Sequence, residues 1–202
     1  VKSLTDNNHN LFVQSGAGEA IGFSDESYTN SGAIILATAK EVYANSELIV
    51  KVKEPMPSEF EYLTNEHTLF TYLHLAGNKK QALDLINTGV TGIAYETVTA
   101  DDGSMPLLAP MSAIAGQLSI VVGSYHLLKP NKGMGTLIGS FGDVKPRVVT
   151  VIGAGVAGTQ SIEQAIANKA IVRIIDLSKN RLDELKNAYG ENNIEYIVSS
   201  DE

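Results

Sequence analysis

Cysteine is absent from these 202 residues, so every role that a thiol could fill is excluded. The chain can form no disulfide, attack no substrate with a thiolate and bind no metal through a cysteine sulfur. This suits the reducing cytoplasm, where we expect the protein to work. The four histidines have no metal-ligand spacing, so we expect no metal site either.

Long hydrophobic runs, a secretory signal and basic blocks are lacking as well. The most apolar stretch, 111–128, is interrupted by polar residues and reads as a buried helix rather than a membrane span. The formal net charge is -8 and the lysines and arginines are scattered, which argues against nucleic acid or an anionic membrane as a partner. The remaining composition, 44% apolar and 19% charged residues with 18 glycines, is typical of a globular α/β protein with one large or two small domains.

The most informative stretch is a glycine-rich turn that follows an apolar run. Val148–Ile152 is rich in branched residues, which predicts a strand buried on both faces of a parallel sheet. The next six residues have the pattern G-x-G-x-x-G: Gly153, Ala154, Gly155, Val156, Ala157 and Gly158. In a dinucleotide site the first glycine allows the tight turn, the second lets a pyrophosphate approach the backbone, and the third lets the next helix pack closely. The helix expected over 156–168 would direct its free N–H groups at the phosphates.

An acidic residue follows at the spacing that such a site requires. A second apolar strand ends in Asp176, ~20 residues after the turn, where the ribose hydroxyls bind. Its carboxylate favours NAD over NADP, because it accepts a hydrogen bond from a free 2′-hydroxyl and repels a 2′-phosphate. Arg173, Lys179 and Arg181 lie nearby and weaken this preference. A glycine turn without a ligand is the alternative, but the flanking strands and helix favour a dinucleotide site.

Strand and helix patterns alternate over residues 10–97, as a parallel sheet with helices on its faces requires. A long helix starts near Met111, and a glycine-rich connector leads from its end to Arg147. We therefore predict an α/β protein of two domains with parallel sheets flanked by helices. The substrate domain occupies 1–128, the connector 129–146, and the first half of a Rossmann NAD-binding domain 147–202.

Both ends of the sequence look incomplete. It opens on Val1 and not on Met, in what resembles the tail of an amphipathic helix. It closes just after a third apolar strand, 194–198, so only a β-α-β-α-β pattern follows Arg147. This is half of the doubled unit that a full dinucleotide-binding domain contains, and we expect an internal fragment of a longer protein.

Two strands of the first domain end in residues suited to chemistry. Lys51-Val-Lys-Glu-Pro closes a strand expected over 47–52, and open α/β sheets bind ligands at the carboxyl ends of their strands. Because side chains alternate along a strand, Lys51 and Lys53 would share one face. An edge strand protected by lysines is the alternative. The strand expected over 69–73 delivers His74, whose reference pKa of ~6.5 suits proton transfer near neutral pH, although a packing histidine is the alternative.

Five motifs together resemble the alanine dehydrogenases, in this order and spacing and over essentially all 202 residues. They are Lys51-Val-Lys-Glu-Pro, Phe70-Thr-Tyr-Leu-His-Leu-Ala, Gly92-Ile-Ala-Tyr-Glu-Thr-Val, Leu107-Leu-Ala-Pro-Met-Ser and Val151-Ile-Gly-Ala-Gly-Val-Ala-Gly. The wider family includes the NAD-binding domain of proton-translocating nicotinamide nucleotide transhydrogenase, which shares the last motif. That domain generally lacks the histidine, so its presence here favours the dehydrogenase.

The resemblance implies a role for each motif. In the alanine dehydrogenases the lysine before Glu-Pro holds the carboxylate or carbonyl of the substrate, and the histidine is the general acid/base; these roles fall on Lys53 and His74. The serine of the fourth motif, Ser112, reaches the cofactor at the cleft between the domains, although a helix-cap serine fits its position equally well. The implied reaction is reversible: L-alanine, NAD⁺ and water give pyruvate, ammonium and NADH. Family members are cytoplasmic homohexamers.

The sequence departs from the family at its ends. The family carries an arginine for the substrate carboxylate on its opening strand and an aspartate near the nicotinamide in the second half of the nucleotide domain, and neither segment is present. We therefore expect these 202 residues alone to be inactive or nearly so, a prediction that normal turnover would refute. Two other functions stay open: domain I of the transhydrogenase, and a degenerate member that binds nucleotide and regulates another process.

Overall fold

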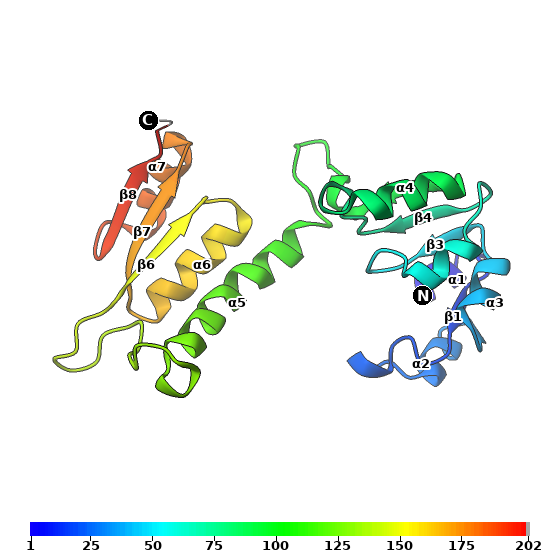
Figure 1. Cartoon of the computed structure of the whole chain (residues 1–202), viewed down its shortest axis with the longest axis horizontal. Helices are drawn as coiled ribbons and strands as arrows, with labels where there is room; N and C mark the ends of the chain where they lie inside the picture. The colour runs from blue at the N-terminus through cyan, green and yellow to red at the C-terminus, as the bar shows by residue number, and fades with distance from the viewer. Residues whose placement is uncertain (201–202) are drawn as a thin grey trace. The chain divides into compact units, whose positions relative to one another are not determined.

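The chain forms two compact units, which follow each other at Met105 and Pro106. The computed structural model describes residues 1–200. Each unit is an α/β body with its own sheets, and Figure 1 labels their helices and strands. The division precedes the long helix that the sequence pattern places at the end of the first domain. That helix packs against a helix of the second unit.

The first unit contains two small parallel sheets. Strand β1 pairs with β2, and strands β3, β4 and β5 pair in that order, all of them parallel. The predicted alternation of strands and helices with parallel pairing is confirmed. In chain order, with η for a 3-10 helix, the elements are α1 (Lys2–Thr5), β1 (Phe12–Gln14), η1 (Glu19–Ile21), α2 (Asp25–Thr29), β2 (Ile34–Leu36), α3 (Ala39–Ala44), β3 (Leu48–Val50), η2 (Pro57–Tyr62), β4 (Thr68–Thr71), η3 (Leu75–Gly77), α4 (Lys79–Thr88), β5 (Thr91–Ala94) and η4 (Tyr95–Thr97).

The larger sheet of the first unit encloses its core against α3 and α4. Alternate residues of β4 point inward, so Leu69 and Thr71 are fully buried. The apolar cluster around them consists of Tyr43, Ile49, Leu63, Leu69, Leu73 and Leu85. This packing fixes the carboxyl ends of β3 and β4, which carry the predicted substrate residues.

Strand β3 ends at Val50, two residues before the predicted end, so Lys51 and Lys53 lie beyond the strand. The amide of Lys51 still donates to the carbonyl of Phe70 (3.1 Å), but the chain then bends toward Pro55, which has no N–H to donate. The predicted shared strand face of the two lysines is therefore wrong, and their side chains have different surroundings.

The second unit is a three-stranded parallel sheet in the order β6-β7-β8 with helices beside it. Its core contains Val151, Ile162, Val172, Ile174 and Leu182, so α6 and α7 pack on the same face of the sheet. This is the predicted half of a Rossmann fold, and it is confirmed. The elements are α5 (Ala109–Leu127), η5 (Lys129–Asn131), β6 (Val148–Ile152), α6 (Val156–Ala167), β7 (Ile171–Asp176), α7 (Lys179–Tyr189) and β8 (Ile194–Val198).

Strand β6 is buried on one face only. Val151 is 8% exposed, whereas Val148 and Ile152 are 52% and 82% exposed. The prediction of a strand buried on both faces is therefore wrong for the described residues. The branched residues of β6 gave no sign of this, because they suit either environment.

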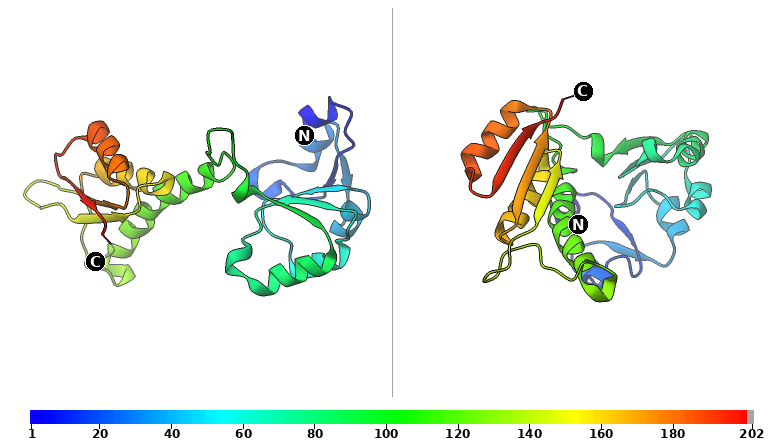
Figure 2. Two further views of the ribbon diagram at one scale, coloured as in Figure 1. Left: turned by 90° about the horizontal axis from the view of Figure 1, so that it is seen from above. Right: turned by 60° about the vertical axis from the view of Figure 1, so that its left-hand side comes forward.

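Helix α5 lies alongside α6, as Figures 1 and 2 show. A Cβ atom at Gly116 would lie 2.1 Å from the carbonyl oxygen of Ala157, so this close approach requires glycine. The hydroxyl groups of Ser119 and Ser161 meet at 2.9 Å across the same contact. In α5 only Gly116 and Ile120 are buried, so this chain covers the helix on one side, whereas its apolar sequence predicts a buried helix.

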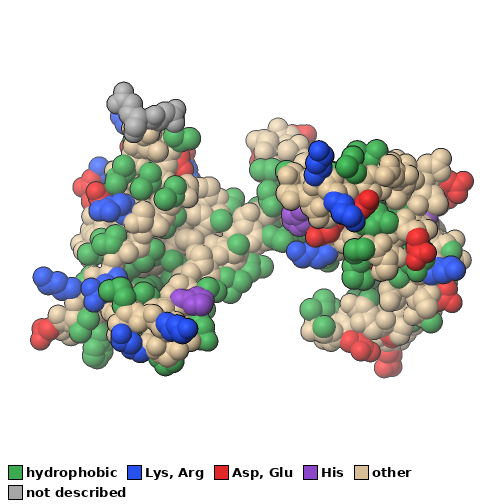
Figure 3. Space-filling model, in the orientation of Figure 1, with side chains coloured by type: hydrophobic (Ala, Val, Ile, Leu, Met, Phe, Trp, Pro, Cys, Tyr) green, Lys and Arg blue, Asp and Glu red, His purple; other side chains and the backbone are tan. Residues whose placement is uncertain are grey.

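Charges of both signs are distributed over the surface. On the face of the first unit drawn in Figure 3, basic and acidic side chains are interspersed. Within residues 1–200, no helix combines the length and the apolar character needed to cross a membrane.

Candidate functional site

The glycine turn of the second unit has the geometry that its three glycines predict. Gly153 follows β6 with φ +90°, a conformation that L side chains rarely adopt. A Cβ atom at Gly158 would lie 1.9 Å from the carbonyl oxygen of Gly153, so α6 packs against the turn only because this side chain is missing. At Gly155 a Cβ would meet nothing within 4 Å. The space beside Gly155 is therefore open to a ligand.

The amino end of α6 offers a positive dipole end at this open space. Gly155 is the N-cap of the helix, and no side chain caps it. The first N–H groups of an α-helix have no partner within the helix, and together with the helix dipole they favour a phosphate. The turn therefore fits the pyrophosphate of a dinucleotide in shape and in charge, with Ala154, Val156 and Ala157 completing its backbone.

Asp176 ends β7 and is held directly beside the glycine turn. Its Oδ2 accepts a hydrogen bond from the amide of Ala154 (2.6 Å), and its Oδ1 accepts one from the amide of Ser178 (2.8 Å). These two amides, first that of Ala154, and then the Arg181 guanidinium lower the pKa of Asp176, while burial opposes them. The carboxylate is thus ionised at neutral pH, and its remaining lone pairs can accept ribose hydroxyls.

Arg181 contacts the glycine turn and the helix that follows it, whereas the sequence shows only a cation close to Asp176 along the chain. Its Nε donates to the carbonyl of Ala154 (3.0 Å), its Nη2 to the hydroxyl of Thr159 (2.8 Å), and its Nη1 to Glu184 (2.7 Å). Arg173 is paired with Glu195 (2.6 Å) on the neighbouring strand. Both guanidinium groups are therefore engaged in contacts within the protein.

Ser112 lies in the first turn of α5, and its amide donates to the carbonyl of Leu108 (3.1 Å). The N-cap of this helix is Leu108, so the alternative interpretation of Ser112 as a cap residue is wrong. A role at the cofactor stays a prediction.

The first unit brings the motifs of Lys53 and His74 together at the carboxyl ends of β3 and β4. The carbonyl of Lys53 accepts a hydrogen bond from the hydroxyl of Thr71 (2.8 Å), which joins the two chain segments. Glu54 follows Lys53, and its Oε2 lies 3.1 Å from Nδ1 of His74. The pKa of Glu54 is lowered, first by its own amide and then by the His74 ring, and the charge of Lys53 contributes as well.

The two lysines of the motif have different tasks. The ammonium of Lys51 forms an ion pair with Glu59, whose side chain is only 8% exposed and also accepts the amide of Met56 (2.6 Å). Lys53 is exposed and follows the same turn. Lys51 is therefore a structural residue, and Lys53 is the cation that remains available to a substrate.

His74 is a partly exposed residue held in an unusual backbone conformation. Its φ of 49° and ψ of 35° are left-handed, which is uncommon for any residue but glycine. Its side chain is 47% exposed, and its ring stacks on Tyr72 at 5.9 Å between centroids. The alternative of a packing histidine is therefore wrong for His74. By contrast, the ring of His67 accepts the amide of Thr64 (3.0 Å) and contacts the carbonyl of Tyr43 (3.1 Å).

Glu96 fixes the backbone at His74, a role that was not predicted from the sequence. Its Oε1 accepts the amide of His74 (2.7 Å), and both its oxygens accept the amide of Leu73 (3.2 Å each). Burial raises the pKa of Glu96, but its own amide and those of His74 and Leu73 outweigh burial and lower it. Glu54 and Glu96 both lie inside the quoted motifs, so their presence there was the available signal.

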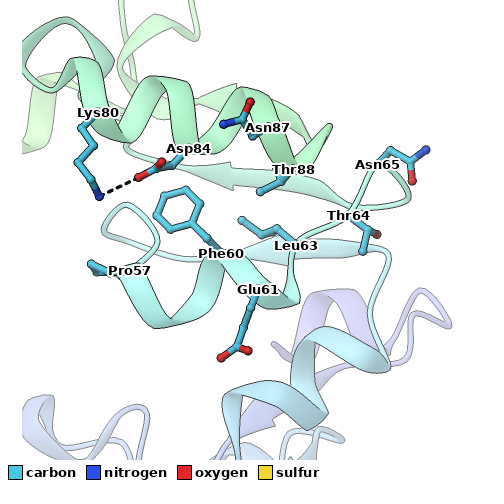
Figure 4. Close-up of a pocket in the computed structure, with 10 residues that line it drawn as sticks. All are labelled: Pro57, Phe60, Glu61, Leu63, Thr64, Asn65, Lys80, Asp84, Asn87 and Thr88. Carbon is cyan, nitrogen blue, oxygen red and sulfur yellow. Dashed lines mark hydrogen bonds and ion pairs between the residues drawn. The ribbon is translucent and has the colours of Figure 1, made fainter.

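Two pockets lie away from the predicted site residues. In the first unit, a pocket of about 600 Å³ lies between η2 and α4, with an ion pair of Lys80 and Asp84 (3.2 Å) at its edge (Figure 4). In the second unit, a pocket of about 680 Å³ lies beside α5 and β6. No predicted site residue lines either pocket. Among the described residues, no three His, Asp or Glu side chains gather as metal ligands.

The fold and these two sets of residues define a class of α/β protein. Half of a Rossmann nucleotide-binding fold follows a first α/β unit that carries a lysine and a histidine at one sheet edge. The alanine dehydrogenase/PNT family models match it, the N-terminal domain over residues 1–115 and the C-terminal domain over 119–202. The chain therefore belongs to the alanine dehydrogenase/PNT family, and the resemblance seen in the sequence is confirmed. A nicotinamide nucleotide as cofactor follows from this membership.

Individual relatives agree with the family. The chain is 43% identical to an alanine dehydrogenase of Methanococcus maripaludis over 192 residues, 95% of this chain and 51% of the relative. It is 42% identical to that of Bacillus subtilis over 200 residues, 99% of this chain and 52% of the relative. The chain thus spans about half the length of the curated relatives it matches.

Solved structures agree too. An L-alanine dehydrogenase, 39% identical, superposes with a TM-score of 0.87 over 98% of this chain and 55% of the other. A transhydrogenase from Sinorhizobium meliloti, 22% identical, superposes with a TM-score of 0.76 over 99% of this chain and 56% of the other. The second likeness extends to the fold alone.

Proposed function

We propose that this chain is part of an NAD-dependent alanine dehydrogenase and contributes its substrate residues and the adenosine side of its nucleotide site. The overall reaction is the reversible conversion of L-alanine, NAD⁺ and water to pyruvate, ammonium and NADH. One observation carries the proposal: Lys53 and Glu54 lie at the same sheet edge as His74, and Glu54 contacts the His74 imidazole at 3.1 Å. The relatives named alanine dehydrogenases support it.

Lys53 is the proposed partner of the substrate carboxylate or carbonyl. Its side chain is exposed, while the neighbouring Lys51 is neutralised by Glu59. A fixed cation at this position attracts the carboxylate of alanine and favours the polarised carbonyl of pyruvate. It also orients the α-carbon, and such positioning can lower a barrier by several kcal/mol.

His74 is the proposed general acid/base. Its ring is held at one edge by Glu54 and on one face by Tyr72, yet the side chain is 47% exposed and can exchange protons. Deprotonated, it takes a proton from the ammonium group or from water; protonated, it returns one in reductive amination. General acid-base catalysis of this kind contributes roughly 10²- to 10⁴-fold.

The proposed cofactor is NAD rather than NADP. When bound, NAD⁺ would supply the hydride acceptor of the reaction, and this chain would hold its pyrophosphate at the glycine turn and its ribose at Asp176. The ionised carboxylate beside the turn would repel a 2′-phosphate, and Arg181 is engaged with Ala154 and Thr159. Ser112 is proposed to contact the cofactor as well.

We further propose a cytoplasmic homo-oligomer, a hexamer by the family resemblance. The complete protein, assayed at steady state with several amino acids and with both NAD⁺ and NADP⁺, tests the proposal. We expect turnover with L-alanine and NAD⁺. A reaction that needs a partner protein and no alanine would instead favour the transhydrogenase role, and failure of every amino acid to reduce NAD⁺ would favour a regulatory role.

A further inference from the structure

Three contacts hold His74 in one orientation. The carboxylate of Glu96 accepts the amides of Leu73 and His74 and so fixes the left-handed backbone. Tyr72 covers one face of the imidazole, with the two rings nearly parallel at 17°. Glu54 binds the edge of the ring at Nδ1 (3.1 Å). Of the three, only the contact with Glu54 acts on a nitrogen that gains or loses a proton.

We infer that Glu54 is a positioning residue that holds the proton of His74 on Nδ1 and leaves Nε2 as the atom that exchanges protons with the substrate. This inference rests on the proposed function and deepens it. It assigns Glu54 a task that is distinct from the substrate-binding task of its neighbour Lys53.

The assignment of the proton follows from donor and acceptor chemistry. An ionised carboxylate only accepts hydrogen bonds, so the nitrogen that contacts it must carry the hydrogen. In a neutral imidazole only one nitrogen carries a hydrogen, which leaves Nε2 of His74 as a bare acceptor. Glu54 is ionised at neutral pH, because its own amide and the His74 ring lower its pKa.

The chain contains an internal reference for this assignment. In His67 the amide of Thr64 donates to Nδ1 (3.0 Å), so that nitrogen is bare and Nε2 donates to the carbonyl of Tyr43 (3.1 Å). His67 and His74 thus have opposite tautomers by the same reasoning. A measurement that separates the two tautomers therefore tests both assignments in one sample.

Nitrogen chemical shifts of the four histidines, measured by long-range ¹H–¹⁵N NMR on the 202-residue chain above neutral pH, distinguish the tautomers. We expect the Nδ1–H form at His74 and the Nε2–H form at His67. Glu54→Ala should convert His74 to a mixture without changing His67, and Glu54→Asp should keep most of the Nδ1–H form. The matched control is Glu66→Gln, because Glu66 is an exposed carboxylate of the same unit. An Nε2–H form at His74, or no response to Glu54→Ala, overturns the inference.

Kinetics of the complete protein separate positioning from mere folding. Glu54→Ala should lower kcat for alanine about 10- to 100-fold, as loss of a partner that orients a histidine does, with a small change in KM. Glu54→Asp should recover part of kcat. A change confined to KM, or equal losses in Glu54→Ala and Glu66→Gln, overturns the inference. Should the NMR response occur while His74→Asn leaves turnover intact, the proposed function fails but the placement of the proton stands.

Discussion

Substitution of Gly155 and Gly158 by alanine separates the fold of the nucleotide turn from its binding function. A Cβ at Gly158 would lie 1.9 Å from the carbonyl oxygen of Gly153, while ordinary contacts begin at 3.4 Å. The obstacle is backbone, so the turn or α6 must move by about 1.5 Å to restore such a contact. Overpacking of this kind costs about 1–3 kcal/mol, and we expect Gly158→Ala to lower the free energy of unfolding by this amount.

The same change at Gly155 should have the opposite profile. Its φ of -69° suits alanine, and the new Cβ meets nothing within 4 Å. The free energy of unfolding should therefore change by less than about 0.5 kcal/mol. The pyrophosphate, however, would lose its approach to the backbone, and we expect NAD affinity to fall at least about tenfold, or 1.4 kcal/mol.

Urea unfolding and calorimetric titration with NAD or ADP-ribose measure the two effects on the 202-residue chain. We expect Gly155→Ala to keep its free energy of unfolding and to bind NAD weakly. We expect Gly158→Ala to lose both unfolding free energy and NAD affinity. If Gly155→Ala binds as well as the unchanged chain, the space beside Gly155 is not the pyrophosphate site. If Gly158→Ala unfolds at the same urea concentration, the reasoning from the close contact is refuted.

Four further substitutions test the electrostatic assignments. The pKa of Asp176 is lowered in the folded state, so its ionised form stabilises the fold above the unfolded-state pKa of about 3.9, and this contribution is lost as pH falls through the lower folded pKa. The Asp176→Asn variant should therefore lose less unfolding free energy than the unchanged chain when the pH is lowered. Equal losses in the two chains would contradict this. Arg181→Met leaves the carbonyl of Ala154 without the hydrogen-bond donor that Arg181 supplies. We expect calorimetry to show about tenfold weaker NAD binding and no increase in NADP affinity. Strong NADP binding would show that the guanidinium does not support the turn as described. Lys51→Met leaves Glu59 as a buried unpaired charge and should lower the free energy of unfolding by about 3 kcal/mol. Lys53→Met should change the free energy of unfolding by less than about 0.5 kcal/mol. Equal effects of the two variants in urea unfolding would disprove the different tasks of the two lysines.

The sequence predicted best those features that depend on local patterns. The glycine turn, β7 with its terminal Asp176 and β8 follow from runs of branched residues and from fixed spacings.

Features that depend on distant partners were not predictable. The structural ion pair of Lys51 depends on the position of Glu59 after a turn. The hydrogen bond to the carbonyl of Ala154 depends on Arg181, which lies in α7. The left-handed backbone at His74 is possible because Glu96, 22 residues away, accepts two consecutive amides. No periodicity or spacing indicates these contacts, because they arise only when the strands pack side by side.

The proposed turnover of alanine requires both Lys53 and His74. NADH formation from L-alanine by the complete protein, compared among Lys53→Met, His74→Asn and the exposed control Lys40→Ala, measures it most directly. We predict a loss of at least about 100-fold in kcat/KM, or 2.7 kcal/mol, for each of the first two variants and no change for the control. Normal turnover by either Lys53→Met or His74→Asn would contradict the account.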